Sequence, residues 1–257
     1  MKLCALKQVF DECYETLQSV NIAFENSTYL RFRIKLTAMS SIHFHHSSLL
    51  KNQIQEELKK RLVERDYFFV PQVNQFRRVT PTGYQCIILN WIPSGDSHVL
   101  EVYLGIRHDA VEDLALPFTN GLPELQNNNF TLFTSLSKLF EQPVQRFNIC
   151  NEEDILPAIN EIQKGIFSRG ISFLERYTRL ENVDNLYNAD PESPMVYLHN
   201  QLHRCMRAIA IARLSLRPDF ERLAVSYREQ LKQMGVAEVV LDRYDRLWRY
   251  LRTYSMN

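Results

Sequence analysis

The spacing of hydrophobic residues predicts three elements in the first quarter of the chain. Apolar side chains three and four residues apart predict a helix at residues 3–19. Apolar residues alternate with basic ones at 29–36, which predicts a half-buried strand. Between residues 49 and 64 an apolar side chain recurs every fourth position among Gln, Glu and Lys. We therefore expect an amphipathic helix that begins near Ser47 or Ser48.

Three strand-like runs follow, at residues 68–79, 84–91 and 99–106. The segments between them are Pro81-Thr82-Gly83 and Pro93-Ser94-Gly95-Asp96, whose residue types favour tight turns. Short turns join antiparallel neighbours, so the pattern predicts a β-meander.

The third run alternates strictly. Glu101 and Tyr103 are expected to face water, while the apolar residues between them face a core that helices cover. The apolar residues are Leu100, Val102, Leu104 and Ile106.

Residues 110–129 are rich in Pro, Gly and Asn, so we expect a long connection with a short helical turn, and then a strand at 130–133. Asn151 is placed to cap a helix with an acidic first turn and an isoleucine stripe. Gly165 and Gly170 are expected to bracket its end. The stripe consists of Ile155, Ile159, Ile162 and Ile166.

A further helical stretch at residues 173–180 leads to Asp190-Pro191-Glu192-Ser193-Pro194, the strongest breaker sequence in the chain. Beyond it we expect helices at 194–216, with Ser193 as N-cap, at 219–234 and at 236–254. Gly235 is the expected terminator of the middle helix.

The fold class predicted from these elements is α+β. A mainly antiparallel meander sheet of four or five strands, covered by helices, forms a domain at residues 1–193. An all-helical C-terminal subdomain follows at 194–257. A piece of about 60 residues buries too little surface to be stable alone, so we expect it to pack on the sheet domain or on another chain.

The amino-acid composition indicates a globular protein. Hydrophobic residues make up 45% and charged residues 23% of 257 residues, as in globular proteins, and thirty basic residues balance thirty acidic ones. From Pro194 onward, however, eleven Lys or Arg face six Asp or Glu. This excess predicts either a basic surface on the tail or charge-complementary docking of the tail onto the rest of the chain.

The chain has five widely spread cysteines without a Cys-x-x-Cys pair, which favours a reducing, cytoplasmic location. No segment approaches the ~20 apolar residues that cross a bilayer, so we expect a soluble protein without a membrane partner.

Two pairs of histidines are candidate metal ligands. His43 and His45 lie two residues apart, but no nearby Cys, Asp or Glu completes a site. His199 and His203 are four apart on a predicted helix, but the Glu of the zinc-protease motif is absent. We predict no metal.

The sequence contains no recognisable catalytic motif. Glycine-rich phosphate loops and the Gly-x-Ser-x-Gly elbow are both missing, so we assign no catalytic residue and no cofactor. A site assembled from residues far apart in sequence stays open, and the enzyme hypothesis is therefore disfavoured without being removed.

The most distinctive segment lies at residues 242–252, where arginines recur every three residues beside aromatic and leucine side chains. Arginines and aromatic residues can anchor a protein interface or contact nucleic acid, and a solvated amphipathic helix is the simplest alternative. The candidate partner-binding residues are Arg243, Arg246, Trp248, Arg249 and Arg252.

Five segments together resemble a bacterial domain-of-unknown-function family in which a helix precedes a meander. They are the helix at 49–64, Asp66-Tyr67-Phe68-Phe69, Phe76-Arg77-Arg78, Tyr84-Gln85-Cys86-Ile87-Ile88 and Leu100-Glu101-Val102-Tyr103-Leu104-Gly105-Ile106. The resemblance covers about residues 49–186. It implies a non-catalytic, immunity-like protein that binds a protein toxin or a similar partner, and it offers no site residues to transfer.

The leading hypothesis is a non-enzymatic protein-binding module, immunity-like or regulatory, and its partner can also be a second copy of the chain. The alternative is a nucleic-acid-binding protein that uses the basic C-terminal helices. A third hypothesis is a hydrolase or metal enzyme that uses His199 and His203.

Overall fold

The computed structural model describes residues 48–94, 97–119, 129–198 and 200–255. The helix predicted at 3–19, the strand predicted at 29–36 and the His43 and His45 pair lie outside the described residues.

The first described element is a helix over residues 48–62, which confirms the amphipathic helix. It ends in a 3-10 turn at Val63–Arg65, and Asp66 then adopts a left-handed conformation with φ 63°. The apolar side chains at every fourth position are all buried in the main core, as the spacing required. They are Leu50, Ile54, Leu58 and Leu62.

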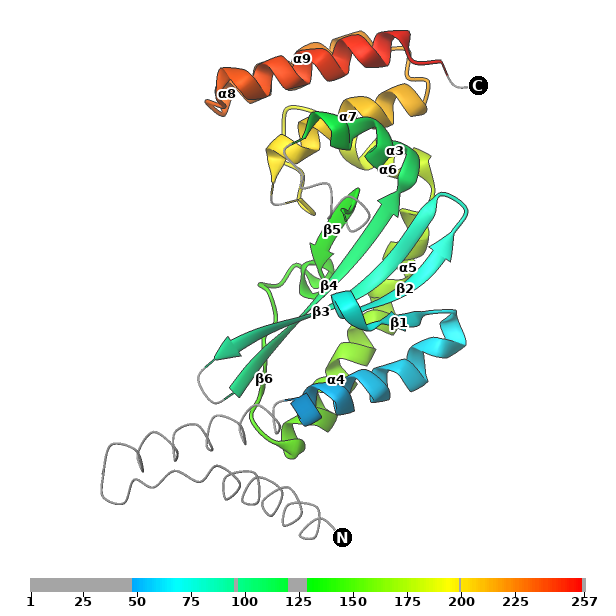
Figure 1. Cartoon of the computed structure of the whole chain (residues 1–257), viewed down its shortest axis with the longest axis vertical. Helices are drawn as coiled ribbons and strands as arrows, with labels where there is room; N and C mark the ends of the chain where they lie inside the picture. Colours follow the sequence, from blue (N-terminus) through cyan, green and yellow to red (C-terminus); the bar gives the residue numbers. More distant parts are fainter. Residues whose placement is uncertain (1–47, 95–96, 120–128, 199, 256–257) are drawn as a thin grey trace, which may run out of the picture. The chain divides into compact units, whose positions relative to one another are not determined.

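An antiparallel sheet of six strands follows, so the predicted meander is confirmed with one strand more than expected (Figure 1). The strands lie in the order β1-β2-β3-β4-β5, and β6 also pairs with β4. The last two strands share one edge of β4, because β6 pairs with His98–Leu100 and β5 with Tyr103–Ile106. The bounds are β1 Phe68–Val70, β2 Gln75–Thr80, β3 Gly83–Ser94, β4 Ser97–His108, β5 Leu132–Ser135 and β6 Phe147–Ile149.

The single strand predicted at 68–79 is wrong, because it consists of two strands. A 3-10 turn at Pro71–Val73 reverses the chain between β1 and β2, which pair with Phe68 opposite Arg77. Proline lacks the N–H that a continuous strand would use, and Asn74 completes the reversal at φ 51°.

One face of β4 matches the predicted alternation and the other does not. The apolar residues at 100, 102, 104 and 106 are buried against helices, as predicted. The opposite face is largely covered as well, so the prediction of a water-facing side is wrong there: Glu101 is 4% exposed. Aromatic rings from outside the strand cover this face, because Phe133 stacks on Tyr103 at 4.9 Å and the ring of Phe130 lies against Gly105.

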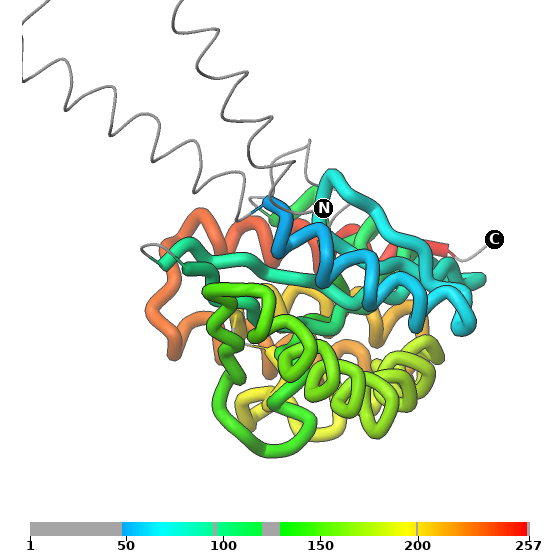
Figure 2. The backbone as a smooth tube through the Cα atoms, turned by 90° about the horizontal axis from the view of Figure 1, so that it is seen from below, coloured from blue at the N-terminus to red at the C-terminus, as the bar shows by residue number. Residues whose placement is uncertain are grey.

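Helices cover the other face of the sheet. The loop after β4 begins with α3, Asp109–Ala115, and a 3-10 turn at Leu116–Phe118, which confirms the short helical turn. Asn151 caps the turn that leads into α4, Ile155–Gly165. Figure 2 shows α4 and the helix after it together on one side of the sheet.

The two glycines do not end this helix, contrary to the prediction. The chain continues through a π-helical turn at Ile166–Gly170 into α5, Ile171–Arg176. A Cβ on Gly165 would lie 2.9 Å from Leu136 Cδ2, so the glycine permits close packing of the helix. A separate helix, α6, spans Leu180–Asn188.

Three helices form the C-terminal region: α7 Gln201–Leu214, α8 Phe220–Gln233 and α9 Glu238–Thr253. The expected helix start at Pro194 is wrong, because α7 begins seven residues later with Asn200 as its N-cap. Gly235 terminates α8 at φ 67°, as expected. Among the described helices, none is long and apolar enough to span a membrane.

Candidate functional site

The predicted partner-binding residues all lie on α9, and the packing of this helix decides which way each one points. Four side chains at helical spacing are fully or nearly buried against the molecule. Successive residues turn by about 100° around a helix, so the remaining positions divide between the side next to α8, the outer surface and the side next to the 3-10 turn at Leu116–Phe118. The buried four are Leu241, Tyr244, Leu247 and Leu251.

Trp248 and Arg252 lie on the α8 side and share one carboxylate. Arg252 donates to Glu221 of α8 with a shortest distance of 2.6 Å, and Trp248 Nε1 donates to the same carboxylate at 3.2 Å. The Arg252 guanidinium also lies 4.6 Å from the Trp248 ring centroid. The hydrogen bond from Arg252 is the main cause that lowers the pKa of Glu221, so this pair stays charged at neutral pH.

A second ion pair joins the two helices about two turns away. Arg228 of α8 donates from Nε and Nη2 to Asp245 at 2.7 and 2.9 Å. Together these residues line a shallow groove of about 330 Å³ between α8 and α9. The lining residues are Arg228, Asp245, Trp248, Arg249 and Arg252.

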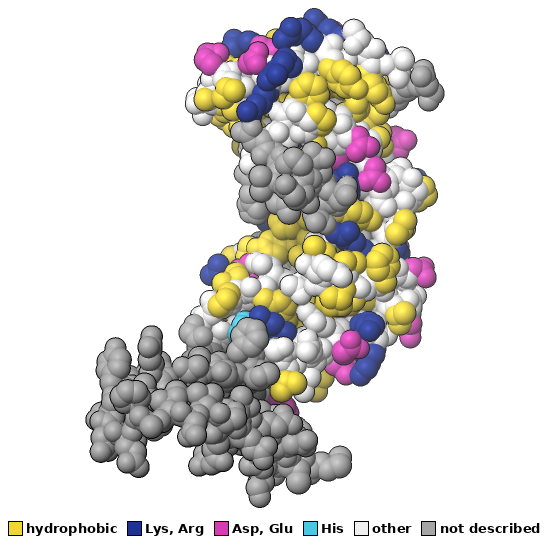
Figure 3. Space-filling view, viewed as in Figure 1, with side chains coloured by type: hydrophobic (Ala, Val, Ile, Leu, Met, Phe, Trp, Pro, Cys, Tyr) yellow, Lys and Arg dark blue, Asp and Glu magenta, His cyan; other side chains and the backbone are white. Residues whose placement is uncertain are grey.

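The opposite side of α9 has a different character. Tyr250, 45% exposed, lies 5.8 Å from Phe118 and 6.0 Å from Tyr254, measured between ring centroids. Arg246 pairs with Asp242 one turn earlier at 3.2 Å, and Arg243 is half-buried. Figure 3 shows a row of Lys and Arg side chains across the α9 end of the molecule, with hydrophobic side chains beside it. We call Phe118, Tyr250 and Tyr254 the aromatic ridge.

The structure therefore brings Trp248, Arg249 and Arg252 together and places Arg243 on another side of the helix. Sequence analysis missed their partners Glu221 and Arg228, together with Asp245 and the aromatic ridge. Phe118 lies more than 100 positions before α9, so no local pattern links it to the helix. The alternation of Arg and acidic residues in α8 and α9 was the available signal for interhelical ion pairs.

Part of the basic excess of the C-terminal region is used inside the molecule, as charge-complementary docking requires. Arg207 of α7 donates from Nε and Nη2 to Glu112 of α3, each at 2.8 Å, and both side chains are almost fully buried. Arg217 pairs with Asp184 of α6 at 3.1 Å. Both ion pairs connect residues on opposite sides of the predicted boundary at 193/194.

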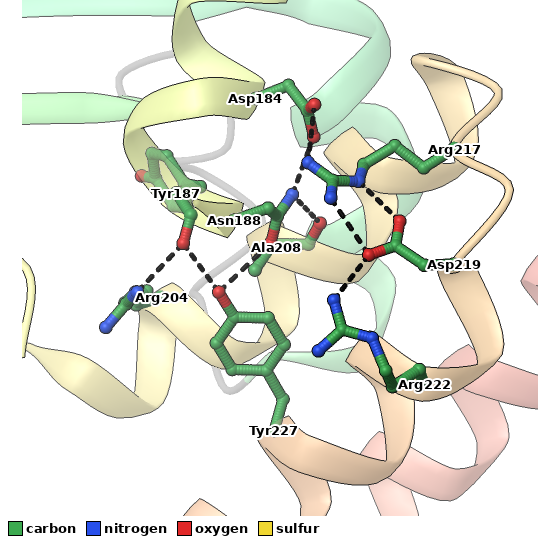
Figure 4. A network of polar contacts seen from close by, with 9 residues as sticks. All are labelled: Asp184, Tyr187, Asn188, Arg204, Ala208, Arg217, Asp219, Arg222 and Tyr227. Carbon is green, nitrogen blue, oxygen red and sulfur yellow. Dashed lines mark hydrogen bonds and ion pairs between the residues drawn. The ribbon is translucent and has the colours of Figure 1, made fainter. Parts of the chain in front are cut away.

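A second network, around Arg204, holds the breaker sequence itself. Figure 4 shows the part of this network at the end of α6, where Arg204 and Tyr227 both donate to the Tyr187 carbonyl. Arg204, 2% exposed, donates to the backbone carbonyls of Tyr187, Asp190 and Ser193. The Tyr227 hydroxyl of α8 donates to the Tyr187 carbonyl at 2.6 Å. These contacts tie the end of α6 and the following loop to α7 and α8.

The predicted pair of His199 and His203 is only partly within the described residues, so its geometry stays a prediction. His203 lies exposed in the first turn of α7, and His199 lies outside the described residues. Within the described ranges, no group of three His, Cys, Asp or Glu side chains is arranged to hold a metal ion.

The chain matches no protein-family model, no curated protein and no solved structure. The resemblance to the domain-of-unknown-function family thus stays a prediction from the sequence pattern.

Proposed function

We propose that this protein is a non-enzymatic protein-binding module whose partner surface is the outer part of α9 with the aromatic ridge. The observation that carries the proposal is the exposed Tyr250, which packs against Phe118 and lies on a helix that also presents Arg246 and Arg249 to solvent. Tyr, Trp and Arg dominate the energetics of protein interfaces. Because the ring of Tyr250 already packs near two other rings, less conformational entropy is lost when a partner covers it.

The charge of α8 and α9 favours a protein partner over nucleic acid. Seven basic and six acidic residues lie between positions 219 and 255. Five of the seven basic residues are paired with carboxylates, namely Arg222, Arg228, Lys232, Arg246 and Arg252. Nucleic acid binding depends on several cations that can each neutralise a phosphate, and here only a small excess is left.

Nucleic acid binding remains the second candidate, and one observation favours it. In the described part of the chain, Arg243 and Arg249 form no ion pair with a carboxylate. Both lie on the same helix as Trp248 and Tyr250, and such a mixture can contact phosphates and stack on bases. This alternative predicts affinity that falls steeply with salt, and a lack of binding to single-stranded DNA at ~50 mM salt would contradict it.

The proposal includes a bacterial, immunity-like or regulatory role in the cytoplasm. The resemblance to the domain-of-unknown-function family supports the role. Free cysteines support the cytoplasmic location, because Cys86, Cys150 and Cys205 form no disulfide with one another.

The first experiment is an affinity capture from native lysate at low salt, with and without nuclease. We expect a protein that is retained after nuclease treatment and that Tyr250→Ala reduces at least ~10-fold, as expected for an interface anchor. Phe68→Ala is the matched control, because Phe68 is an aromatic side chain of similar exposure, 50%, on β1. The proposal fails if no protein is retained, or if both variants lose it equally.

A further inference from the structure

The groove between α8 and α9 contains two arginines with fixed orientations. Arg228 is fixed by two hydrogen bonds to Asp245, and Arg252 by a forked contact with Glu221. Each pair uses Nε and one terminal nitrogen of the guanidinium. A guanidinium carries five N–H donors, so each arginine keeps donors on Nη1 for another acceptor.

Arg249 is the third arginine of the groove and differs from the other two. It forms no ion pair with any described carboxylate, and its Nε donates at 3.2 Å to the backbone carbonyl of Asp245 in the preceding turn. This bond orients the side chain while both terminal nitrogens are left for a ligand. Two of the three guanidiniums are thus paired with a carboxylate, Asp245 or Glu221, and Arg249 is the one that is not.

We infer that this groove binds a carboxylate side chain of an acidic segment in the partner protein, with Arg249 as the residue that contacts the carboxylate. The inference rests on the proposed function and specifies the chemistry of the partner. A single guanidinium without a carboxylate partner fits one carboxylate ligand, and the planar fork of arginine matches the two oxygens of a carboxylate. One face of Trp248 is covered by Arg252, which leaves less room for base stacking and makes nucleic acid a poorer ligand here.

The test uses the full-length chain in a Trp91→Phe background. The chain has two tryptophans, so the fluorescence of this variant reports on Trp248 in the groove. The probe is a peptide that carries three consecutive glutamates. The same peptide with glutamines and a single-stranded oligonucleotide serve as comparisons. We expect saturable binding of the glutamate peptide and at least ~10-fold weaker binding of the glutamine peptide, because charge-assisted hydrogen bonds are lost.

Substitutions in α9 assign the binding to the groove. Arg249→Gln should weaken binding of the glutamate peptide at least ~5-fold, because a hydrogen bond between charged groups is removed. The affinity of Arg249→Lys for the glutamate peptide should lie between that of the natural chain and that of Arg249→Gln, since lysine keeps the charge without the planar fork. Arg243→Gln is the matched control, because Arg243 also forms no ion pair but lies on another side of α9, and it should leave the affinity unchanged.

The inference is overturned if the glutamate peptide does not bind, if the glutamine peptide binds equally well, if Arg249→Gln has no effect or if the oligonucleotide binds more tightly than the peptide. Its failure is distinguishable from failure of the proposed function. If Tyr250→Ala abolishes capture of the lysate protein while Arg249→Gln does not, only the carboxylate specificity is wrong. If no lysate protein is retained although the peptide binds through Arg249, the proposed function fails and the groove keeps its specificity.

Discussion

At the scale of single residues, the buried pair of Glu112 and Arg207 is the most consequential contact in the described part of the chain. Two 2.8 Å hydrogen bonds join the side chains, and the Thr131 hydroxyl donates to the same carboxylate at 2.8 Å. Both charges have lost their water, and the pairing offsets that cost. Removal of one partner alone therefore leaves an uncompensated charge in the interior.

Glu112→Gln should lower the free energy of unfolding by about 3 to 5 kcal/mol, since Arg207 keeps its charge but loses its counter-ion. Urea denaturation followed by circular dichroism measures the change. The control is Glu57→Gln, which breaks an exposed pair with Lys60 and should have no measurable effect. The double variant Glu112→Leu with Arg207→Met should recover most of the loss, and a double variant as unstable as the single one would contradict this account.

His108 makes stability dependent on pH. Its ring is buried, and Nε2 lies 2.9 Å from the Tyr177 carbonyl oxygen, which assigns the proton of the neutral ring to Nε2. Burial lowers the pKa of His108 below its ordinary value of 6.5, more than the carbonyl bond raises it. The unfolded chain therefore takes up a proton near pH 6.5 while the folded chain resists it, so this contribution to stability is lost as pH falls below 6.5.

The expected slope from this one group is at most ~1.4 kcal/mol per pH unit below pH 6.5. Urea denaturation at pH 7.5 and pH 5.5 should show a smaller difference for His108→Gln than for the natural chain. Glutamine can still donate to the Tyr177 carbonyl but does not titrate. Equal differences in the two proteins would show that other histidines carry the effect.

At the scale of elements, two glycines test whether conformation or space determines a helix boundary. Gly235 has φ 67°, and a Cβ added to it would have no atom within 4 Å. Gly170 has a helical φ of −61°, and an added Cβ would make ordinary van der Waals contacts from 3.4 Å. Gly235→Ala should destabilise by about 1 kcal/mol through left-handed strain. Gly170→Ala should stabilise by about 0.5 to 1 kcal/mol, because alanine restricts the unfolded chain. Thermal unfolding should show a lower midpoint for Gly235→Ala and a higher midpoint for Gly170→Ala. Midpoints that shift in the same direction would refute the distinction.

Local sequence patterns predicted the elements whose causes are local. The apolar spacing at 50–62, the turn at Pro81-Thr82-Gly83 and the terminator Gly235 were predicted, because each depends on neighbouring residues. Features that depend on residues far apart in sequence were not predicted. The loop before α7 is held by Arg204, and the outer face of β4 is covered by Phe130 and Phe133.

The candidate site shows the same limit. The period of three identified α9 as unusual, but it could not indicate which arginines have partners. Glu221 and Asp245 neutralise two cations of the groove, and the pairing became visible only once α8 and α9 were packed together. Arg249 is distinguished from its neighbours by the lack of such a pair among the described residues, which periodicity cannot show.

At the scale of the whole molecule, α7 connects the sheet to the last two helices. Residues Arg204 to Ala212 are all buried, which is unusual for a helix in a small subdomain. One side contacts α3 through the Arg207 pair, and another contacts α6 and α8 through the network around Arg204. Separation of residues 194–257 from the rest would expose this helix together with its buried charges.

The described elements should consequently unfold in one cooperative transition, and the two tryptophans provide a direct test. Trp91 lies on β3, in the sheet, and Trp248 lies on α9, so the variants Trp91→Phe and Trp248→Phe each leave one fluorescent probe, on α9 and on β3 respectively. If the buried pair of Glu112 and Arg207 couples both regions, each variant should show a fluorescence midpoint in urea that coincides with its own circular dichroism midpoint. Separate midpoints within one variant would instead show that residues 1–193 and 194–257 unfold as two domains.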